Sequence, residues 1–189
     1  MGQTARQRIA FDEYVRMEAM SPLRHEWLDG AVWAMAGGTP DHAAIAVNVT
    51  TQLATQLRGK RCRVFGADLR VRVRATGLGT YPDASVVCGA LQYDPDDVSK
   101  TTAVNPKVIV EVLSPSTEDY DRGEKLEHYK KLPTLEEIVL VAHDERRIEV
   151  WRREGRRWRR HDFTAGVAEL HSLKCELSVA EVYRNPLED

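Results

Sequence analysis

The sequence predicts a single domain of the α/β or α+β class, built around a mixed sheet. Apolar residues recur at helical spacing in 39–57 and 121–132, whereas two-residue alternation and short apolar runs, typical of strands, fill much of 61–113 and 138–163. No repeat, low-complexity tract or long Gly/Pro/Ser linker interrupts the 189 residues, so we expect one domain over 1–189. A chain of this length can bury a full hydrophobic core.

The N-terminal part is predicted to form a helix, a hairpin and a longer helix. Residues 11–19 place apolar side chains on one side of a helix that Ser21-Pro22 ends. Asp29-Gly30, between HEWL and AVWA, fits a two-residue type I′ turn. Thr39 is a suitable N-cap, and Pro40 suits the first position of a helix that we expect to reach about Leu57.

The middle of the chain is predicted to form strands. In RCRVFGADLRVRVRA, apolar residues alternate with arginines, which indicates a strand with one face in water. Pro82, in YPDASVV, is expected at a strand start or edge because it has no N–H to donate. The apolar run of residues 108–113 is interrupted only by Glu111, which is typical of a central strand covered on both faces.

The C-terminal part is predicted to add a helix, three strands and a short final helix. The segment 121–124, DRGE, has the form of a capping box, and Pro133 lies just beyond the expected end of that helix. Strands are expected in IVLVAHD, RIEVWRR and RWRRHDF, with a turn at Glu154-Gly155, and a helix in SVAEVY.

Several classes of protein are disfavoured by composition. No window approaches the 18 or so apolar residues of a membrane span, and the N-terminus lacks an apolar stretch of signal-peptide length, so we expect a cytoplasmic chain with no membrane partner. The three cysteines, Cys62, Cys88 and Cys175, are widely spaced and form no CxxC pair. They are expected to be small buried hydrophobic residues rather than a disulfide framework or a zinc site.

Charge is balanced overall but unevenly distributed. The chain has 27 basic and 29 acidic residues, yet residues 146–160 carry a local charge of +6, which leaves −8 elsewhere. This segment also holds Trp151 and Trp158, and arginine with exposed aromatic rings is typical of nucleic-acid-binding surfaces. The alternatives are a solvated hairpin whose arginines pair with nearby glutamates, or a subunit contact. The arginines expected to contact DNA are Arg152, Arg153, Arg156 and Arg157.

Glu111 is the most informative residue, because a carboxylate inside an apolar strand is costly to dehydrate unless a cation, a proton or hydrogen bonds compensate it. One explanation is an ion pair with Arg72 or Arg74 from a neighbouring strand. The other begins from Asp83, at the start of the preceding predicted strand, because consecutive strands can bring two carboxylates together. Two close carboxylates repel unless a divalent cation or a shared proton lies between them, and Mg²⁺ needs few protein oxygens.

The segments HEWLDGAVWAMAGGTPDH, YPDASVV and NPKVIVEVLSPSTEDYDRGEKLEHYKKLPTLEEIVLVAHD together resemble the Uma2 family, also known as DUF820, of restriction-endonuclease-like proteins. The resemblance covers roughly residues 10 to 185. It implies a PD-(D/E)XK nuclease fold, with a mixed central sheet flanked by helices and an N-terminal β-hairpin. By this resemblance Asp83 and Glu111 bind Mg²⁺ or Mn²⁺ at the catalytic site.

The resemblance also assigns a lysine, but at an unusual position. The superfamily pattern places it two residues after the second acid, where this chain has Leu113. Members of the family carry a lysine on the following helix, which is Lys125 here. A long flexible side chain can bring its ammonium to the site from a helix. Considered without the resemblance, Lys125 would be interpreted as a solvated helix residue.

Further candidates have ordinary structural interpretations beside the catalytic one. Glu26 would supply an oxygen to the metal or to a water molecule, or else would lie on the wet face of the hairpin. His42 matches a histidine common in the family, or would simply form a hydrogen bond at a helix start. Ser114 and Ser116 lack a GxSxG context, and a loop explains them better than a nucleophile.

The sequence therefore supports two functional hypotheses. The first is a Mg²⁺-dependent endonuclease that hydrolyses phosphodiester bonds of DNA, with a homodimer expected because two strands must be cut. The second is a catalytically silent module with a nuclease fold that serves binding or assembly, which the Leu113 departure and the net charge of −2 motivate.

Overall fold

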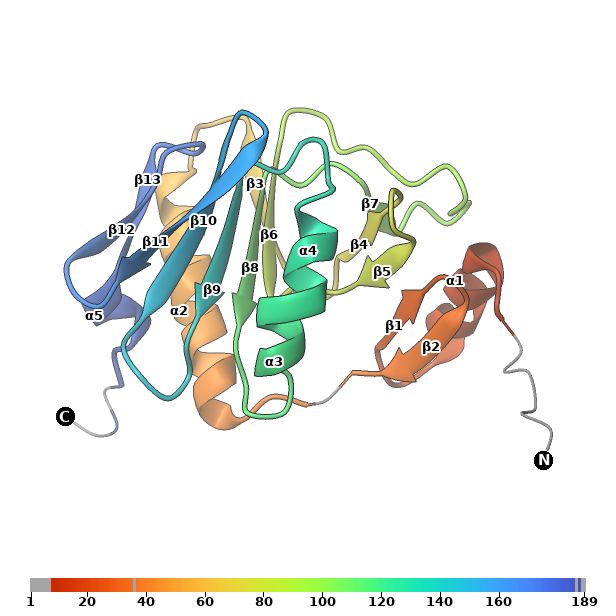
Figure 1. Ribbon diagram of the computed structural model, residues 1–189, viewed down its shortest axis with the longest axis horizontal. Helices are drawn as coiled ribbons and strands as arrows, with labels where there is room; N and C mark the ends of the chain where they lie inside the picture. Colours follow the sequence, from red (N-terminus) through yellow and green to blue (C-terminus); the bar gives the residue numbers. More distant parts are fainter. Residues whose placement is uncertain (1–7, 36, 186, 188–189) are drawn as a thin grey trace.

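The computed structural model of the protein describes residues 8–35, 37–185 and 187, and its strands form three sheets with helices packed against them (Figure 1). The central sheet has six strands in the order β11-β10-β9-β8-β6-β3. Strands β8 and β9 are parallel and the other neighbours are antiparallel, so the predicted mixed sheet is confirmed. Its strands are β3 (Cys62–Gly66), β6 (Ala84–Cys88), β8 (Val108–Val112), β9 (Glu137–Val141), β10 (Ile148–Glu154) and β11 (Arg157–Phe163).

A second sheet of five strands, in the order β2-β1-β5-β4-β7, lies beside the central one, and β12 pairs with β13 in a separate hairpin. Among the described helices, none has both the length and the apolar character needed to cross a bilayer. The remaining elements are β1 (His25–Leu28), β2 (Ala31–Ala34), β4 (Arg70–Val73), β5 (Leu78–Thr80), β7 (Thr102–Ala103), β12 (Val167–Leu170), β13 (Cys175–Ser178), α1 (Phe11–Met20), α2 (Pro40–Gln56), α3 (Glu118–Tyr120), a wide π-type turn η1 (Asp121–Lys125), α4 (Leu126–Tyr129) and α5 (Val179–Val182).

The central sheet is covered on both faces, as the apolar run of β8 predicts. Val108, Val110 and Val112 pack with the apolar face of α2 in one cluster, whereas Ile109 packs with Leu126 of α4 in another (Figure 1). Because side chains alternate along a strand, Glu111 shares the face of Ile109 and points toward the helical segment 118–129. The placement of Glu111 under this helix follows directly from the two-residue period.

The N-terminal predictions are confirmed in detail. The turn between β1 and β2 has positive φ at both Asp29 (46°) and Gly30 (93°), as a type I′ turn requires. Glycine is required at position 30 for two reasons. One is the positive φ, and the other is that a Cβ at this position would lie 2.7 Å from the Cβ of Arg8. Helix α2 begins where expected, with the Thr39 side chain accepting a hydrogen bond from the His42 N–H.

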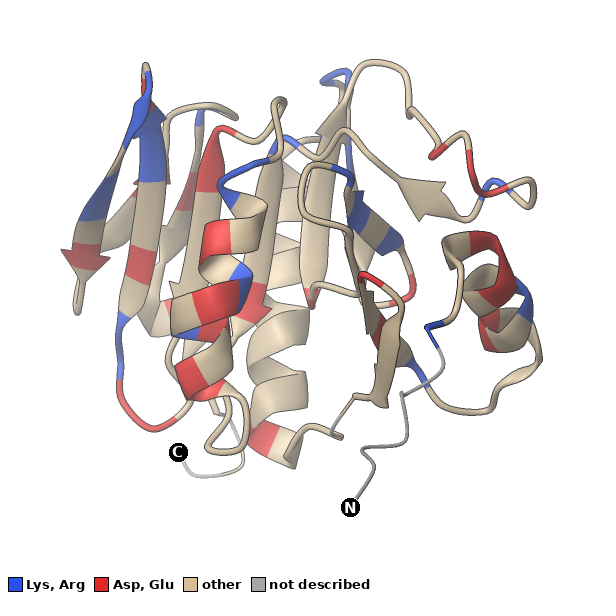
Figure 2. Cartoon of the chain, turned by 45° about the vertical axis from the view of Figure 1, so that its right-hand side comes forward, with Lys and Arg blue, Asp and Glu red and all other residues tan. Residues whose placement is uncertain are grey.

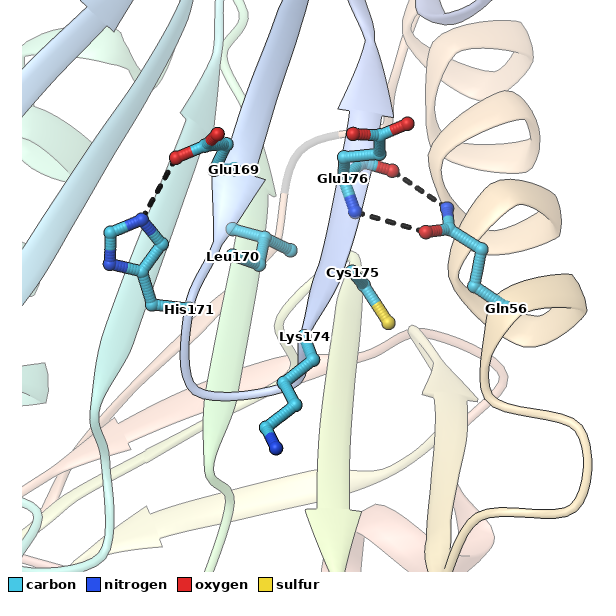
Figure 3. A pocket seen from close by; sticks show the side chains of 7 residues that line it. All are labelled: Gln56, Glu169, Leu170, His171, Lys174, Cys175 and Glu176. Atoms are coloured by element: carbon cyan, nitrogen blue, oxygen red, sulfur yellow. Dashed lines mark hydrogen bonds and ion pairs between the residues drawn. The ribbon is translucent and has the colours of Figure 1, made fainter.

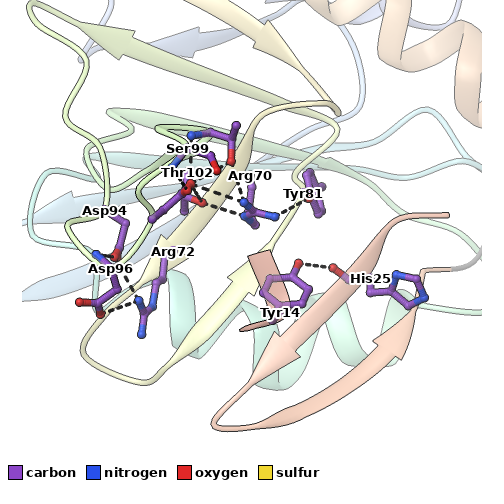
Figure 4. Close-up of polar contacts among 11 residues, drawn as sticks. Tyr14, His25, Arg70, Arg72, Tyr81, Asp94, Asp96, Ser99 and Thr102 are labelled. Atoms are coloured by element: carbon purple, nitrogen blue, oxygen red, sulfur yellow. Dashed lines mark hydrogen bonds and ion pairs between the residues drawn. The ribbon is translucent and has the colours of Figure 1, made fainter. Parts of the chain in front are cut away.

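The prediction that the alternating strand has a wet face is wrong. Arg70 of β4 is only 3% exposed, and its guanidinium donates to Tyr81, Thr101 and Thr102 (Figure 4). Arg72 of the same strand pairs with Asp94 and Asp96. The loop between β6 and β7 folds over this face and supplies acceptors for both arginines. The alternation of arginines with apolar residues therefore indicates a face buried under charged partners, and not a face exposed to solvent.

The interpretation of the cysteines also needs correction. Cys62 and Cys88 form a disulfide, and Cys175 is the free, buried cysteine. The two bonded residues are directly opposite each other in the antiparallel pair β3–β6, with their Cα atoms 4.0 Å apart. Register between strands, rather than spacing along the chain, brings the sulfur atoms together.

The predicted capping box does not cap a helix. The helical segment begins at Glu118, where the N–H of Asp121 already donates to the carbonyl of Thr117, 2.8 Å away. Asp121 is therefore inside the helical segment, and its side chain is free to reach Lys125 four residues later. The β12–β13 hairpin is an element that the sequence did not predict; its apolar side chains complete the cluster around α2.

Candidate active site

A cleft of about 360 Å³ opens where β6 begins and β8 ends, between the β1–β2 hairpin, the start of α2 and the α3–η1 segment. Four acidic side chains line it together with one lysine and one histidine. These residues are Glu26, His42, Asp83, Glu111, Asp121 and Lys125. The structure therefore brings together the acids, the lysine and the histidine that the sequence singled out.

The two predicted metal-binding acids lie on neighbouring strands. Ala84 pairs with Val110 in the β6–β8 ladder, so Asp83, just before β6, lies beside the end of β8. The backbone N–H of Val112 donates to Oδ2 of Asp83 at 2.7 Å. This hydrogen bond fixes the Asp83 carboxylate next to the residue that follows Glu111.

Lys125 is the centre of the buried part of the site. Its ammonium nitrogen lies 3.0 Å from Oε1 of Glu111, 3.2 Å from Oε1 of Glu26 and 3.2 Å from Oδ1 of Asp121. Each of these four side chains is at most 5% exposed. Lys125 is thus not a solvated helix residue, and Glu26 does not lie on a wet face.

Local structure explains how a helix lysine reaches a strand carboxylate. The π-type turn η1 ends at Lys125, and Tyr129, one turn later, donates its hydroxyl hydrogen bond to the Glu111 carboxylate. Leu113, at the superfamily lysine position, is fully buried in the cluster that includes Leu126. Arg72 and Arg74 pair with acids of the 94–96 loop, so the ionic partner of Glu111 is Lys125.

Burial and crowding of carboxylates change the protonation of the site. Burial, together with the nearby Asp121 and Asp83 carboxylates, raises the pKa of Glu111 to about 8, against the opposing effects of Lys125 and Tyr129. Burial alone would lower the pKa of Lys125, but Glu111, Tyr129 and Glu26 raise it well above its usual value. Lys125 is therefore held as a cation, whereas Glu111 takes up a proton at a higher pH than an exposed glutamate does, and metal binding competes with that proton.

His42 is a polar contact of Asp83. Its Nε2 lies 3.3 Å from Oδ2 of Asp83, and the two side chains are 18% and 17% exposed. The hydrogen bond to Asp83 raises the pKa of His42, although burial opposes the shift. Helix α2 holds this ring in place because His42 lies in its first turn. Of the residues that line the cleft and carry charge, these two are the more accessible.

The donor set suits a hard divalent cation. The carboxylates of Asp83 and Glu111, which come from neighbouring strands, could supply oxygen ligands, and Oε2 of Glu26 is buried with no hydrogen-bond partner in the described chain. Within residues 8–35, 37–185 and 187, no three His, Cys, Asp or Glu side chains form a metal-binding cluster by themselves. The protein residues therefore fit an ion that keeps several of its own waters, which is the habit of Mg²⁺.

Three site residues were not assigned by the sequence. Asp121 was interpreted as a helix cap, although its four-residue spacing from Lys125 is a recognisable signal. Tyr129 was expected only as part of the helix in 121–132, one turn after Lys125, and its hydroxyl donates to Glu111. Thr80 donates to Glu26 across the five-stranded sheet, a contact that no local pattern indicates.

The arginine-rich hairpin is not near these acids. Strand β10 runs antiparallel to β9, so the tip at Gly155 lies at the end of the central sheet opposite the cleft (Figure 1). Figure 2 shows basic residues along this hairpin. Arg152 binds the buried Glu137, and Arg153 donates to the carbonyls of Lys130 and Leu132. Arg156 and Arg157, next to the tip, are exposed.

A second cavity, of about 430 Å³, lies between the end of α2 and the β12–β13 hairpin (Figure 3). Its polar groups are largely engaged with one another. Gln56 exchanges two hydrogen bonds with the backbone of Glu176, and His171 lies 2.9 Å from Glu169. This cavity has no counterpart to the buried lysine and its acids, so the cleft around Lys125 is the candidate active site.

Comparisons with known proteins identify the family of the chain. Residues 11–181 match the model of the Uma2 family, whose description is "Putative restriction endonuclease". The chain is 33% identical over 180 residues to an uncharacterized protein of Synechocystis sp., slr1290, covering 94% of this chain and 92% of the relative. A second uncharacterized Synechocystis protein, sll1609, is 26% identical over 147 residues, covering 77% and 82%.

A solved structure shares the fold. The crystal structure of "a putative nuclease belonging to DUF820" from Anabaena variabilis superposes with a TM-score of 0.74 at 18% identity, covering 93% of this chain and 97% of that one. This likeness confirms the nuclease-like mixed fold with flanking helices. Since the family model spans nearly all of the described domain, the chain belongs to the Uma2 family.

Proposed function

We propose that this protein is a Mg²⁺- or Mn²⁺-dependent endonuclease that hydrolyses phosphodiester bonds of DNA. The observation that carries the proposal is the contact of the buried Lys125 ammonium with Glu111, beside a carboxylate, Asp83, that is held by the β8 backbone. Membership of a family described as restriction endonucleases gives the reaction class. The substrate and the metal are inferred from the chemistry of the site.

Asp83 and Glu111 are the residues that would hold the metal. A bound Mg²⁺ supplies Lewis acidity toward a phosphoryl oxygen and lowers the pKa of a water molecule. Loading requires Glu111 to lose its proton, and Lys125 at 3.0 Å favours the ionised carboxylate. Metal affinity is therefore expected to rise between about pH 6 and 8.

Lys125 provides the fixed positive charge of the site. Its contacts with Glu26, Glu111 and Asp121 hold the ammonium in one place, so it can stabilise negative charge that develops on a phosphate without reorganising. Glu26 holds the lysine through Oε1, which binds both the ammonium and the Thr80 hydroxyl, and its Oε2 is left for the metal or a water molecule. Asp83 is oriented by Val112 N–H and His42.

The alternative is a catalytically silent module that keeps the fold. The observation in its favour is that the Lys125 ammonium already gives Glu26, Glu111 and Asp121 a shared cationic partner within the protein. The endonuclease proposal includes a homodimer, because each cleft cuts one strand at a time and two subunits would cut both strands of a duplex.

The test is cleavage of supercoiled, linear and single-stranded DNA with Mg²⁺ or Mn²⁺, using the wild type, Asp83→Asn and Glu111→Gln. We expect both substitutions to abolish cleavage while the circular dichroism spectrum stays native. Calorimetric titration of Mg²⁺ separates the two proposals, because a silent module gives no binding heat that Asp83→Asn removes. Intact DNA in every assay, together with no such heat, would favour the silent module.

A further inference from the structure

The mouth of the cleft carries an aromatic pair that the hydrolytic chemistry does not use. Trp33 of β2 and Tyr120 of α3 both line the cleft, and their ring centroids are 6.4 Å apart with planes at 81°. Trp33 is 36% exposed, which is unusual for the largest apolar side chain. In the hairpin register Trp33 is opposite Glu26, so it lies on the face of the hairpin that borders the site.

The edge-to-face geometry leaves an aromatic face accessible. In such a pair one ring presents its edge to the other, so the two rings do not cover both of their faces. The hydroxyl of Tyr120 is buried and lies beside the Glu26 carboxylate, so Tyr120 is anchored from below. A planar ligand that enters the cleft therefore has the partly exposed Trp33 ring on which to stack.

The charges that line the cleft are unsuited to a duplex backbone. Among the described lining residues there is no arginine, and the side chains of Lys125 and His42 are each paired with carboxylates. A duplex is bound mainly through phosphate neutralisation by basic side chains, which this rim does not provide. The acids also lie deep, because Glu26 and Glu111 are each 3% exposed. A strand must enter the cleft to bring a phosphate to them.

We propose that the cleft takes an unpaired segment of DNA, with one nucleobase stacked on Trp33 beside Tyr120. In a duplex both faces of a base are covered by its neighbours, so only an unstacked base offers a face to an aromatic side chain. Stacking of the base on the aromatic ring favours an unpaired strand, since every base has a face that can stack. This inference rests on the proposed nuclease function and specifies its substrate class.

The experiment measures fluorescence anisotropy of a short labelled single strand, the same strand with one abasic site, and a blunt duplex, each with and without Mg²⁺. The proteins are the wild type, Trp33→Ala, Trp33→Phe and Tyr93→Ala. Tyr93 is a matched control because it is an exposed aromatic residue, 42% accessible, that lines a different cavity. Thermal melts establish that each variant is folded.

We expect the wild type to prefer the single strand. Trp33→Ala should weaken that binding about tenfold and leave duplex binding unchanged, whereas Trp33→Phe keeps most of the affinity and Tyr93→Ala all of it. Tighter binding of the duplex, or equal losses for both DNA forms in Trp33→Ala, would overturn the inference. Binding does not require turnover, so the two proposals can fail separately. Selective binding of the single strand without any cleavage would count only against the nuclease function. Cleavage of all DNA forms that Trp33→Ala leaves unaltered would count only against the stacking site.

Discussion

The ammonium nitrogen of Lys125 lies 3.0 Å from a carboxylate oxygen of Glu111, and both side chains are 5% exposed. The lysine comes from the helical segment and the acid from the central sheet, while Glu26 reaches the same ammonium from the other sheet. A buried charge network of this kind is costly to break, since removal of one member leaves the others uncompensated. It couples the stability of the fold to the chemistry of the cleft.

Lys125→Met is expected to destabilise the protein by about 3–5 kcal/mol, because Glu26, Glu111 and Asp121 lose their shared cation. Urea unfolding followed by circular dichroism measures the change. Adding Glu26→Gln to this variant should restore part of the loss. Lys107→Met is the matched control, since its pair with Glu136 is more exposed and should contribute less than about 1 kcal/mol. Equal losses for the two lysines would contradict the prediction.

Glu111→Gln is expected to make stability less sensitive to pH. The pKa of Glu111 is about 8 in the folded protein and near 4.5 in its ordinary state, so the folded chain binds the extra proton between these values. The free energy of unfolding therefore falls as pH rises through this window, by at most about 1.4 kcal/mol per pH unit from this group. Unfolding measured in EDTA should show the variant gaining on the wild type as pH rises. A difference that is constant with pH would exclude this assignment.

His42→Ala should show a pH dependence of the same sign as Glu111→Gln, with the variant gaining on the wild type as pH rises. The pKa of His42 is raised in the folded protein, so the contact with Asp83 stabilises fully below the ordinary pKa and is lost as pH rises through the folded value. We expect a loss of about 1 kcal/mol near pH 5.5 and much less near pH 9. His171→Ala, which removes an exposed contact with Glu169, should change stability little at either pH. Equal destabilisation by His42→Ala at pH 5.5 and pH 9 would contradict a stabilising contact between His42 and Asp83.

Reduction of the Cys62–Cys88 disulfide is expected to lower the free energy of unfolding by about 2–4 kcal/mol, because it releases the edge strand β3 from β6. Thermal melts with and without dithiothreitol measure the effect as a lower Tm. The Cys62→Ser/Cys88→Ser variant is the control, since its Tm should already be low and should not respond to reductant. A reductant effect of equal size in that variant would show that the change does not come from the Cys62–Cys88 disulfide.

Arg156 and Arg157 are expected to contribute to binding of long DNA and not of short strands, because they lie at the end of the sheet opposite the cleft. Arg156→Ala/Arg157→Ala should weaken binding of a long duplex and reduce its salt slope by roughly 2. Stability should be unchanged. Arg152→Ala is a useful contrast, since loss of its contact with Glu137 should destabilise the fold. An unchanged salt dependence of duplex binding would show that these two arginines do not contact DNA and that the hairpin tip is only solvated.

Local pattern was sufficient for the elements that depend on neighbouring residues in the chain. The type I′ turn at Asp29-Gly30, the N-cap Thr39 and the doubly covered strand β8 are all determined by a few adjacent side chains, and each is confirmed. The sequence also predicts that Asp83 lies beside the strand of Glu111, because consecutive strands are often neighbours, and β6 and β8 are neighbours in the sheet.

Contacts between distant segments could not be read in this way. The alternation of Arg70 and Arg72 is the same whether that face meets water or the acids of a loop, and only the fold of the loop decides. The Cys62–Cys88 disulfide depends on strand register, and the contact of Glu26 with Lys125 depends on how the two sheets dock. Family resemblance pointed to Lys125, whereas its three carboxylate partners are visible only in three dimensions.

The docking of two sheets around one lysine has a consequence for how the protein is made. Glu26 leaves the ribosome early and Lys125 much later, and neither the hairpin nor the central strands alone contain a complete site. On the proposed function, a nascent chain or a proteolytic fragment is therefore harmless to the host genome. Cutting would begin only once the segment that carries Lys125 has folded against both sheets.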